Sequence, residues 1–213
     1  MLLNSYYFIF FFLILFFIYW KMAKNATLQN VVLLLGSCIF YFSWSPQFLA
    51  LLLVTIVATF YISKKIIGAE DSSRKWWSRF GILVVLLQLL YFKYFNFFIE
   101  NVHDFLQQIG FNSPKNILAI ILPLGISFYS FRMIGYLLDV RNKKVKEIPT
   151  LLEYSVFVAY FPTMISGPID RAVPFVKQIN VKRDFSSESF SDGLRQLLWG
   201  LFKKLVVADT IAT

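Results

Sequence analysis

Long apolar runs separated by short charged connections dominate this sequence. A run of about 20 apolar residues is long enough to cross the hydrocarbon core of a bilayer as a helix. Hydrophobic residues make up 58% of the 213 residues, which is more than a soluble domain of this size can bury. The pattern predicts an all-α integral membrane protein with several spans. The expected spans are residues 2–20, 28–42, 46–62, 80–99 and 117–138.

The short connection between the second and third runs and the single cysteine add two constraints. Only "SWSP" separates the second and third runs, which predicts a tight helical hairpin with Pro46 opening the third helix. Cys38 is the only cysteine, so the chain forms no intramolecular disulfide and no metal site built on cysteine pairs. The sequence shows no glycine-rich phosphate loop, nucleophile elbow or His/Cys ligand set, and we assign no metal ligands.

The basic residues predict the orientation of the spans. The formal net charge is +9, and Lys and Arg number two in 21–27, none in 43–45, five in 63–79, one in 100–116 and four in 139–150. This alternation places the N-terminus outside and the cation-rich connections in the cytoplasm. Cations confined to short connections are typical of a lipid bilayer environment, and we expect no nucleic-acid partner.

The segment after the fifth run is expected to dip into the membrane and return. Its apolar part, residues 154–165, is too short for a crossing, and four cations follow within 166–190. Pro162 and Pro168 each remove a backbone donor, and broken backbone is tolerated at membrane depth only inside protein or beside a cavity. We therefore predict a re-entrant segment over 154–170, with a sixth crossing as the alternative. Residues 190–213 are amphipathic and predict an interfacial or partly buried helix.

A few charged residues are candidates for chemistry. Arg132 lies inside the fifth run, and Asp139 follows two helical turns later, so both can project on one side of that helix. A charge at that depth indicates a functional site by default, although a structural pair between helices explains it equally well. Asp170 and Arg171 end the dip, where they either hold irregular backbone or meet an anionic ligand. His103 is expected to be a solvated loop histidine.

Pro123, Gly125 and Ser127 in "LPLGISFYSF" are expected to loosen or kink the fifth helix. Gly125 would also allow a neighbouring helix to approach closely. From spacing alone, these three residues are interpreted as packing devices.

Several stretches together resemble a known family. "VVLLLGSCIFYFSW", "LLYFKYFNFF", "LPLGISFYSFRMIGYLLDV" and "FPTMISGPIDR", followed by "GLFKKLVVAD", resemble in order and spacing the N-terminal part of the membrane-bound O-acyltransferase (MBOAT) family. The resemblance covers almost the whole chain. It is strongest to the bacterial branch that O-acetylates alginate and other extracellular polysaccharides, with related peptidoglycan acetylases.

The resemblance implies a multi-pass enzyme of the bacterial inner membrane, a ring of helices around a thinned centre, with no bound cofactor. Such an enzyme passes an acyl group, here expected to be acetyl from a cytoplasmic thioester such as acetyl-CoA, across the membrane toward a polysaccharide acceptor and an extracytoplasmic acetyltransferase partner. Residues 1–213 would form the N-terminal portion of one transmembrane domain. The family-motif and passage-lining residues are expected to be Pro123, Gly125, Ser127, Phe128, Arg132, Asp139, Phe161, Pro162, Gly167, Pro168, Asp170 and Arg171.

The sequence also departs from the family pattern. The family's catalytic histidine is expected in a later helix, past the "GLFKKLVVAD" motif and beyond Thr213, and His103 falls in a connection that does not match it. We therefore assign no catalytic residue and expect the printed chain to be a fragment, with natural truncation at Thr213 as the other interpretation. The "PIDR" ending also resembles the branch that transfers D-alanine to teichoic acids. A non-catalytic membrane scaffold and a transporter are the remaining alternatives.

Overall fold

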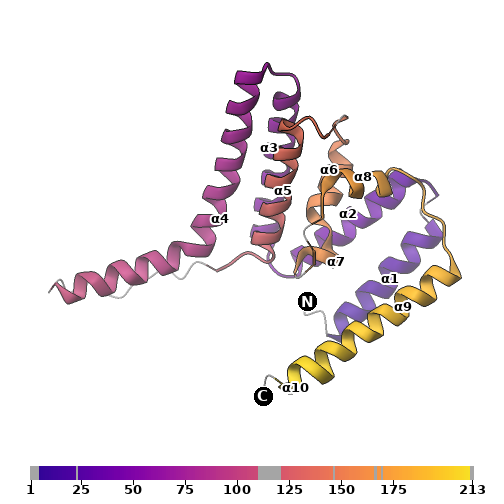
Figure 1. Cartoon of the computed structure of the whole chain (residues 1–213). Helices are drawn as coiled ribbons and strands as arrows, with labels where there is room; N and C mark the ends of the chain where they lie inside the picture. The colour runs from indigo at the N-terminus through magenta and orange to yellow at the C-terminus, as the bar shows by residue number, and fades with distance from the viewer. Residues whose placement is uncertain are drawn as a thin grey trace.

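The computed structural model of the chain describes residues 5–22, 24–109, 121–145, 147–165, 167, 168 and 170–211, and these residues form helices and connections without a strand (Figure 1). The helices are α1 (Tyr6–Met22), α2 (Ala26–Phe42), α3 (Pro46–Ile67), α4 (Asp71–Gln108), α5 (Ile126–Arg141), α6 (Leu151–Ala159), α7 (Phe161–Met164), α8 (Ala172–Ile179), α9 (Ser187–Phe202), a π-helical stretch (Lys203–Ala208) and α10 (Asp209–Ile211).

Some of the sequence predictions fall outside the described residues. These are the parts of the predicted spans at 2–4 and 117–120, and positions 166 and 169 of the predicted dip. Thr213, beyond which the family's catalytic histidine is expected, also lies outside the described residues, as does position 212 of the last segment. The expectation that the chain is a fragment, and the absence of an assigned catalytic residue, therefore stay predictions.

Two of the described helices, α3 and α4, are long and apolar enough to cross a membrane. α1 and α2 are apolar but shorter. Figure 1 shows α4 bending outward in its second half, so that only its first half stands beside α3 and α5. The all-helical class is confirmed, while the full multi-pass arrangement stays a prediction.

Local sequence signals set where several helices begin. Asn25 caps α2 by accepting a hydrogen bond from the Leu28 backbone N–H at 2.8 Å. α3 begins at Pro46 after a short turn, as predicted, because proline at the first helical position gives up no intrahelical hydrogen bond. Thr150 and Glu153 form a capping box at the start of α6.

The core lies where α3, α4 and α5 pack together. A Cβ on Gly81 of α4 would come within 2.9 Å of side-chain atoms of both Ile62 and Leu137, so the missing side chain lets the three helices approach closely. Gln88 joins the same helices by accepting from Thr55 at 2.8 Å and donating to the Tyr129 hydroxyl at 3.1 Å. Close packing and interhelical hydrogen bonds of this kind are what hold helices together where lipid, rather than water, surrounds them.

α6 and α7 form a buried excursion that starts and finishes at the same end of the molecule. Residues 154–159 of α6 are all buried, and α6 packs against α2, α3 and α5. The chain then turns through α7 and comes back, so that Arg171 contacts Asp139 near the end of α5. A re-entrant path has this geometry, and its placement in a membrane stays a prediction.

Arg183 lies on the connection between α8 and α9 and tethers that connection to the start of α2. Its guanidinium donates from two nitrogens to the Asn30 side-chain oxygen, each at 3.0 Å, and its Nε donates to the Gln29 side-chain oxygen at 3.0 Å. Gln29 Nε2 donates in turn to the Arg183 carbonyl at 2.6 Å. Both partner side chains are buried, so this network satisfies polar groups that would otherwise be costly to enclose.

Three expectations drawn from the sequence are wrong in detail. In the described part of the expected fifth span, the helix begins only at Ile126, because residues 121–125 are not helical and Gly125 has a positive φ. The connection expected over 63–79 is only Gly68–Glu70, and its cations lie on the ends of α3 and α4. His103 is not a loop residue, since it lies in α4 with 6% of its surface exposed.

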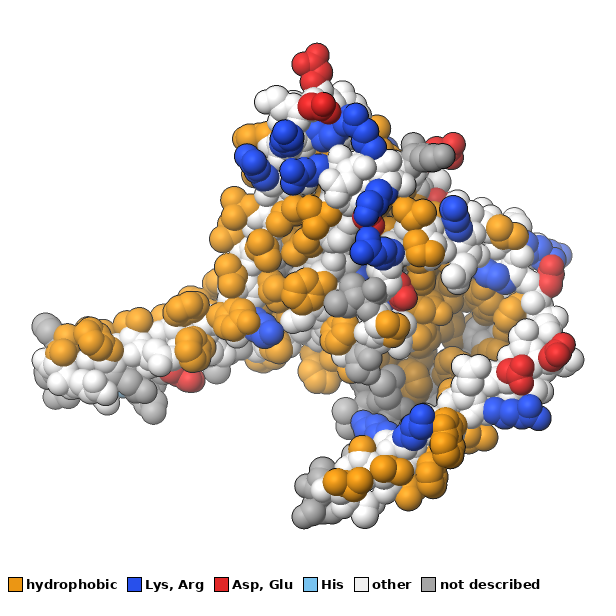
Figure 2. Space-filling model, viewed as in Figure 1, with side chains coloured by type: hydrophobic (Ala, Val, Ile, Leu, Met, Phe, Trp, Pro, Cys, Tyr) orange, Lys and Arg blue, Asp and Glu red, His pale blue; other side chains and the backbone are white. Residues whose placement is uncertain are grey.

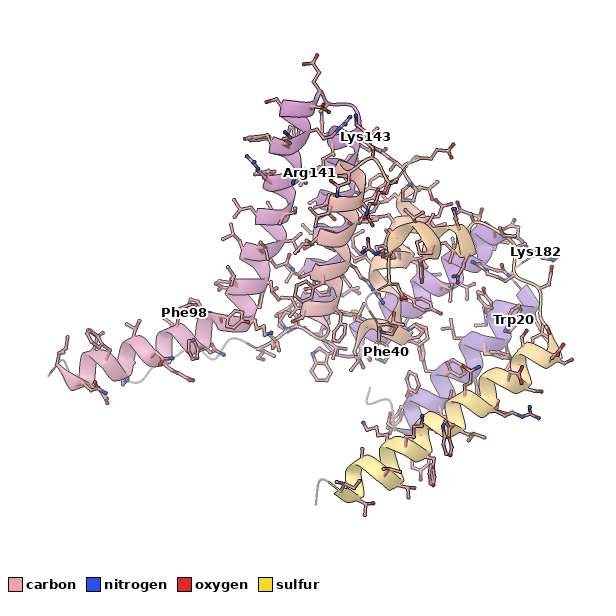
Figure 3. The ribbon with its side chains drawn as sticks, viewed as in Figure 1. Trp20, Phe40, Phe98, Arg141, Lys143 and Lys182 are labelled. Carbon is pink, nitrogen blue, oxygen red and sulfur yellow. The ribbon has the colours of Figure 1, made fainter. Side chains whose placement is uncertain are left out.

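Lys and Arg side chains gather mainly at one end of the molecule (Figure 2). This is the end where α3 and α5 finish and α4 begins, and Figure 3 shows Arg141 and Lys143 there. Lys182, on the connection between α8 and α9, extends the same cationic region. The distribution agrees with the charge alternation seen in the sequence.

Candidate functional site

The turn before α5 is built around Gly125. This residue has φ +65, in the left-handed region that glycine alone adopts freely. A Cβ at this position would also lie 2.5 Å from the Met164 carbonyl oxygen of α7. On its other side the turn is held by Tyr41 of α2, whose hydroxyl donates to the Leu124 carbonyl at 2.7 Å. The start of α5 is therefore fixed between α2 and α7.

Arg132 projects from α5 toward the broken end of α6. Its Nη1 donates to the carbonyls of Phe157 at 3.3 Å and Val158 at 3.5 Å. Carbonyls in the last turn of a helix lack intrahelical partners and carry the negative end of the helix dipole. A buried cation in this place therefore satisfies the carbonyls that the break after α6 leaves without helical donors.

The same guanidinium also binds α7 and the segment that leads from α7 to Arg171, which we call the returning chain. Nη2 of Arg132 donates to the Thr163 hydroxyl of α7 and, at 3.5 Å, to the Asp170 carboxylate. Gly167 lies so close to Thr163 that an added Cβ would clash with it. Arg132 is 2% exposed, and its Nε has no hydrogen-bond partner among the described residues.

A second ion pair joins α5 to the returning chain. Arg171 contacts the Asp139 carboxylate at 3.4 Å, and Lys144 approaches the same oxygen at 3.9 Å. The Asp139 side chain is 9% exposed, whereas the Arg171 side chain is 71% exposed. Two pairs of opposite polarity, Arg132 with Asp170 and Asp139 with Arg171, thus fix the register between α5 and the returning chain.

These residues surround a cavity of about 330 Å³ between α5 and the returning chain. Its charged lining consists of three cations and two carboxylates. The lining residues that bear charge are Arg132, Asp139, Lys144, Asp170 and Arg171. Gly135 opens part of the wall, since a Cβ there would meet no atom within 4 Å. The cavity can accept a polar or anionic group, which the exposed side chains of Lys144 and Arg171 are placed to bind.

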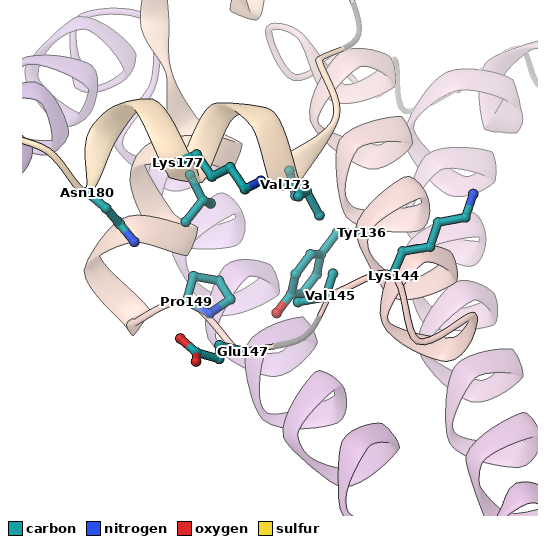
Figure 4. A pocket seen from close by; sticks show the side chains of 10 residues that line it. Tyr136, Lys144, Val145, Glu147, Pro149, Val173, Lys177 and Asn180 are labelled. Carbon is teal, nitrogen blue, oxygen red and sulfur yellow. The ribbon is translucent and has the colours of Figure 1, made fainter.

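A second cavity, of about 350 Å³, shares Tyr136, Lys144 and Ala172 with the first. Figure 4 shows its lining, in which Lys144 and Lys177 come from opposite sides and Val145, Pro149 and Val173 give apolar surface. Glu147 supplies one carboxylate. The two cavities adjoin at these shared residues, at the cation-rich end of the molecule, and we refer to them together as the recess.

The sequence-predicted site residues separate into three groups. Arg132, Asp139, Asp170 and Arg171 meet around the cavity. Gly125 and Gly167 flank α7, and Pro162 lies in its first turn, exposed. The remaining residues lie elsewhere: Pro123, Ser127 and Phe128 near the start of α5, Phe161 against the rings of Phe8, Phe11 and Phe40, and Pro168 exposed on the return. Their expected role in lining a passage stays a prediction.

Two site residues were missed from the sequence. Thr163 stands inside the quoted motif but gave no charge or spacing signal, and it receives a hydrogen bond from Arg132. Lys144 was counted only as a loop cation, although it lines both cavities. Neither residue could be paired with its partner without the fold.

The side chains at this site are suited to binding a substrate and to placing charge beside it. Among the described residues, no group of three or more His, Cys, Asp or Glu is arranged to hold a metal ion. The described lining contains guanidinium, ammonium and carboxylate groups but no histidine and no cysteine. These groups can orient a substrate and stabilise negative charge.

Comparison with known proteins gives several relatives. The chain is 34% identical over 186 residues to a probable alginate O-acetylase of Pseudomonas syringae pv. tomato, covering 86% of this chain and 36% of that protein. It is 30% identical over 217 residues to a peptidoglycan O-acetyltransferase of Helicobacter pylori, covering 89% of this chain and 40% of that protein. A teichoic acid D-alanyltransferase of Bacillus subtilis is 30% identical over 104 residues, covering 47% of this chain and 25% of that protein.

The chain spans a little over a third of the length of the O-acetylases that it matches. No protein-family model matches the sequence, and no solved structure does. The similarity to the two O-acetylating enzymes extends over most of the chain, while the similarity to the D-alanyltransferase covers less than half of it.

Proposed function

This chain is homologous to bacterial polysaccharide O-acetylases, and from that relationship we propose that it forms part of a membrane-bound O-acyltransferase. Its product is an O-acetylated extracellular or cell-wall polysaccharide. The observation that carries the proposal is similarity over most of the chain to two enzymes with different acceptors but the same kind of transfer. The charged recess between α5 and the returning chain is the part of the structure that suits such a substrate.

The proposed orientation places the cation-rich end in the cytoplasm, with the protein crossing the inner membrane several times and its N-terminus outside. The clustering of Lys and Arg around the ends of α3 and α5 supports this placement. The acyl donor is a cytoplasmic thioester such as acetyl-CoA. Lys144, Lys177 and Arg171 around the two cavities favour a donor of negative charge.

The broken segment from α6 to Arg171 forms the route from this recess toward the opposite side. Backbone that is neither helix nor strand is tolerated at membrane depth only inside protein or beside a cavity. Here Arg132 donates hydrogen bonds to the α6 carbonyls that the break leaves without helical donors. An extracytoplasmic acetyltransferase would receive the acyl group and complete the transfer to the polysaccharide.

Arg171 tests this role directly. In the full-length protein, Arg171→Ala removes a largely exposed side chain, so the cost in stability is small, yet it takes a cation out of the cavity. We expect polysaccharide acetylation to fall about tenfold or more, with unchanged amounts of protein in the membrane fraction. Arg195→Ala is the matched control, because Arg195 is an exposed arginine on α9 paired with Asp192. Unaltered acetylation in Arg171→Ala would contradict the role given to Arg171.

D-Alanyl transfer to a teichoic acid is the second candidate, favoured by the match to the D-alanyltransferase over 104 residues. The two candidates differ in the ester formed. Mild alkaline release from the modified polymer, followed by mass spectrometry, identifies acetate or D-alanine. Release of neither in the wild type, with the protein present in the membrane, would favour a non-catalytic scaffold.

A further inference from the structure

Two adjoining cavities lie between α1, the start of α2, the connection from α8 to α9 and α9, and they share no lining residue with the acyl-transfer recess. The first, of about 250 Å³, is polar and basic, and the second, of about 350 Å³, is an apolar groove. They share Trp20, Asp184 and Phe185. Figure 3 shows Trp20 near the end of α1 and Lys182 on the facing connection.

The basic cavity has more cationic side chains than carboxylates to pair with them. It is lined by Lys21, Lys24, Lys182, Arg183 and Asp184. Arg183 is bound to Gln29 and Asn30 and forms the fixed floor, while Lys182 pairs with Asp184 at 2.6 Å. Lys21 and Lys24 are exposed and have no carboxylate partner among the described residues. The cavity therefore offers two free ammonium groups beside a rigid guanidinium.

The apolar groove runs from this basic end between α1 and α9. Phe12, Phe16 and Trp20 line it from α1, and Phe190, Leu194 and Leu197 line it from α9. The order of contacts is antiparallel, since Phe16 meets Phe190 at a ring-centroid distance of 5.5 Å while Trp20 meets Phe185 at the same distance. From residue 20 to residue 12 the groove follows about 12 Å of helix. None of the described residues of α9 is buried, so the groove is open on the described surface.

We propose that these two cavities form a binding site for an anionic phospholipid, with the phosphate headgroup at Lys21 and Lys24 and an acyl chain in the groove between α1 and α9. The charge of the headgroup complements the basic cavity, and the apolar tail complements the aromatic and leucine lining. Trp20 stands at the junction of the two cavities, as is typical of an aromatic ring at a membrane interface, and the ring centroid of its neighbour Tyr19 lies 5.6 Å from the Arg183 guanidinium carbon.

This site is separate from the acyl-transfer recess and rests only on the membrane placement proposed above. A basic surface near the bilayer attracts anionic lipids in general, but the adjoining groove makes this site selective for a headgroup and a chain in one molecule. The proposal can therefore fail while the acyltransferase function and the membrane placement stand.

The test measures lipid binding to the full-length protein in mild detergent by native mass spectrometry, with phosphatidylglycerol and phosphatidylcholine carrying the same acyl chains. We expect phosphatidylglycerol to bind about 25-fold more tightly than phosphatidylcholine, since each of the two lysines near an anionic lipid contributes roughly fivefold. Lys21→Gln with Lys24→Gln should abolish that preference. Lys65→Gln with Lys75→Gln is the matched control, because both lysines are exposed and line neither cavity.

A second pair of variants tests the groove. Gly193 lines it and Gly200 does not, and a Cβ on either glycine would meet no atom within 4 Å. Both lie in α9, so Gly193→Leu and Gly200→Leu gain similar helix propensity. We expect Gly193→Leu to weaken both lipids several-fold and Gly200→Leu to change neither. The lysine variants give an independent result if filling the groove disturbs the protein.

Four outcomes would overturn the proposal. Equal binding of the two lipids by the wild type would remove the headgroup role. Complete competition by inorganic phosphate, or phosphatidylglycerol binding unchanged in Gly193→Leu, would reduce the site to an anion site without an acyl chain. A wild type that retains no lipid would show that another segment or a second copy covers the groove.

Discussion

Replacement of Arg132 by methionine would test what holds the broken segment in place. Methionine keeps an unbranched side chain of similar reach but removes the charge and every donor. The carbonyls of Phe157 and Val158, the Thr163 hydroxyl and the Asp170 carboxylate would each lose a partner. The break between α6 and α7 should then become the weakest part of the described structure.

The size of the effect follows from burial. Removing one partner of a fully buried ion pair costs about 3–5 kcal/mol. The Arg132 side chain is 1% exposed but that of Asp170 is 35% exposed, so water can replace part of what Asp170 loses. We therefore expect about 3 kcal/mol for Arg132→Met. Asp170→Asn should cost only about 1 kcal/mol, because the α6 carbonyls keep their donor.

Thermal unfolding of the purified full-length protein in detergent measures these differences. For 213 residues, 1 kcal/mol corresponds to roughly 2–4 °C in Tm, and a longer protein shifts less per kcal/mol, so Arg132→Met should lower the Tm about three times as much as Asp170→Asn. The double variant gives the coupling between the two residues, expected near 1 kcal/mol. Arg195→Met is the control and should stay within about 0.5 kcal/mol, because both partners of its ion pair are exposed.

The ordering of the two variants is the critical result. Equal losses for Arg132→Met and Asp170→Asn would mean that the ion pair alone carries the effect and that the α6 carbonyls contribute nothing. A neutral Arg132→Met would refute the reasoning entirely.

Three further predictions concern the turn before α5, the tether at α2 and the orientation. Gly125→Ala should destabilise by about 3 kcal/mol, because the left-handed backbone and the contact with the Met164 carbonyl both oppose a Cβ, whereas Gly135→Ala should be neutral or slightly stabilising in the same melting assay. Asn30→Leu should cost about 2 kcal/mol, because it removes the oxygen that accepts from two nitrogens of the Arg183 guanidinium and the amide that donates to the Ile179 carbonyl. Exposed Gln178→Leu should change the Tm little, and equal shifts would argue against the tether. Single cysteines that replace Lys143 or Lys182, in a Cys38→Ser background, should be labelled by an impermeant maleimide from the cytoplasmic side. A single cysteine that replaces Trp44 should be labelled from the opposite side. Labelling of all three from one side would contradict the proposed orientation.

Much of the helical layout was predictable because it follows from local rules. Apolar length predicted the positions of most of the described helices, and Pro46 predicted the start of α3, while the re-entrant segment over 154–170 stays a prediction. The errors arose where local rules compete. α5 begins later than the expected fifth span because Gly125, just before Ile126, has a left-handed backbone that does not fit the helix that apolarity alone would extend. His103 was assigned to a loop because polar residues around it broke the apolar run, yet α4 continues through them.

Sequence alone determined that the chain is helical, that its cations collect at one end and that Arg132 and Asp139 share one side of a helix, since helical periodicity fixes which residues share a face. Only the tertiary structure decided their partners. Both residues line one cavity, but Arg132 pairs with Asp170 and Asp139 pairs with Arg171, from positions 38 and 32 residues away in the chain. Periodicity says nothing about how far the returning chain slides along α5. That register is set by these two ion pairs together with the glycine contacts at α7 and the hydrogen bonds to the α6 carbonyls, all of which form only when the helices are packed.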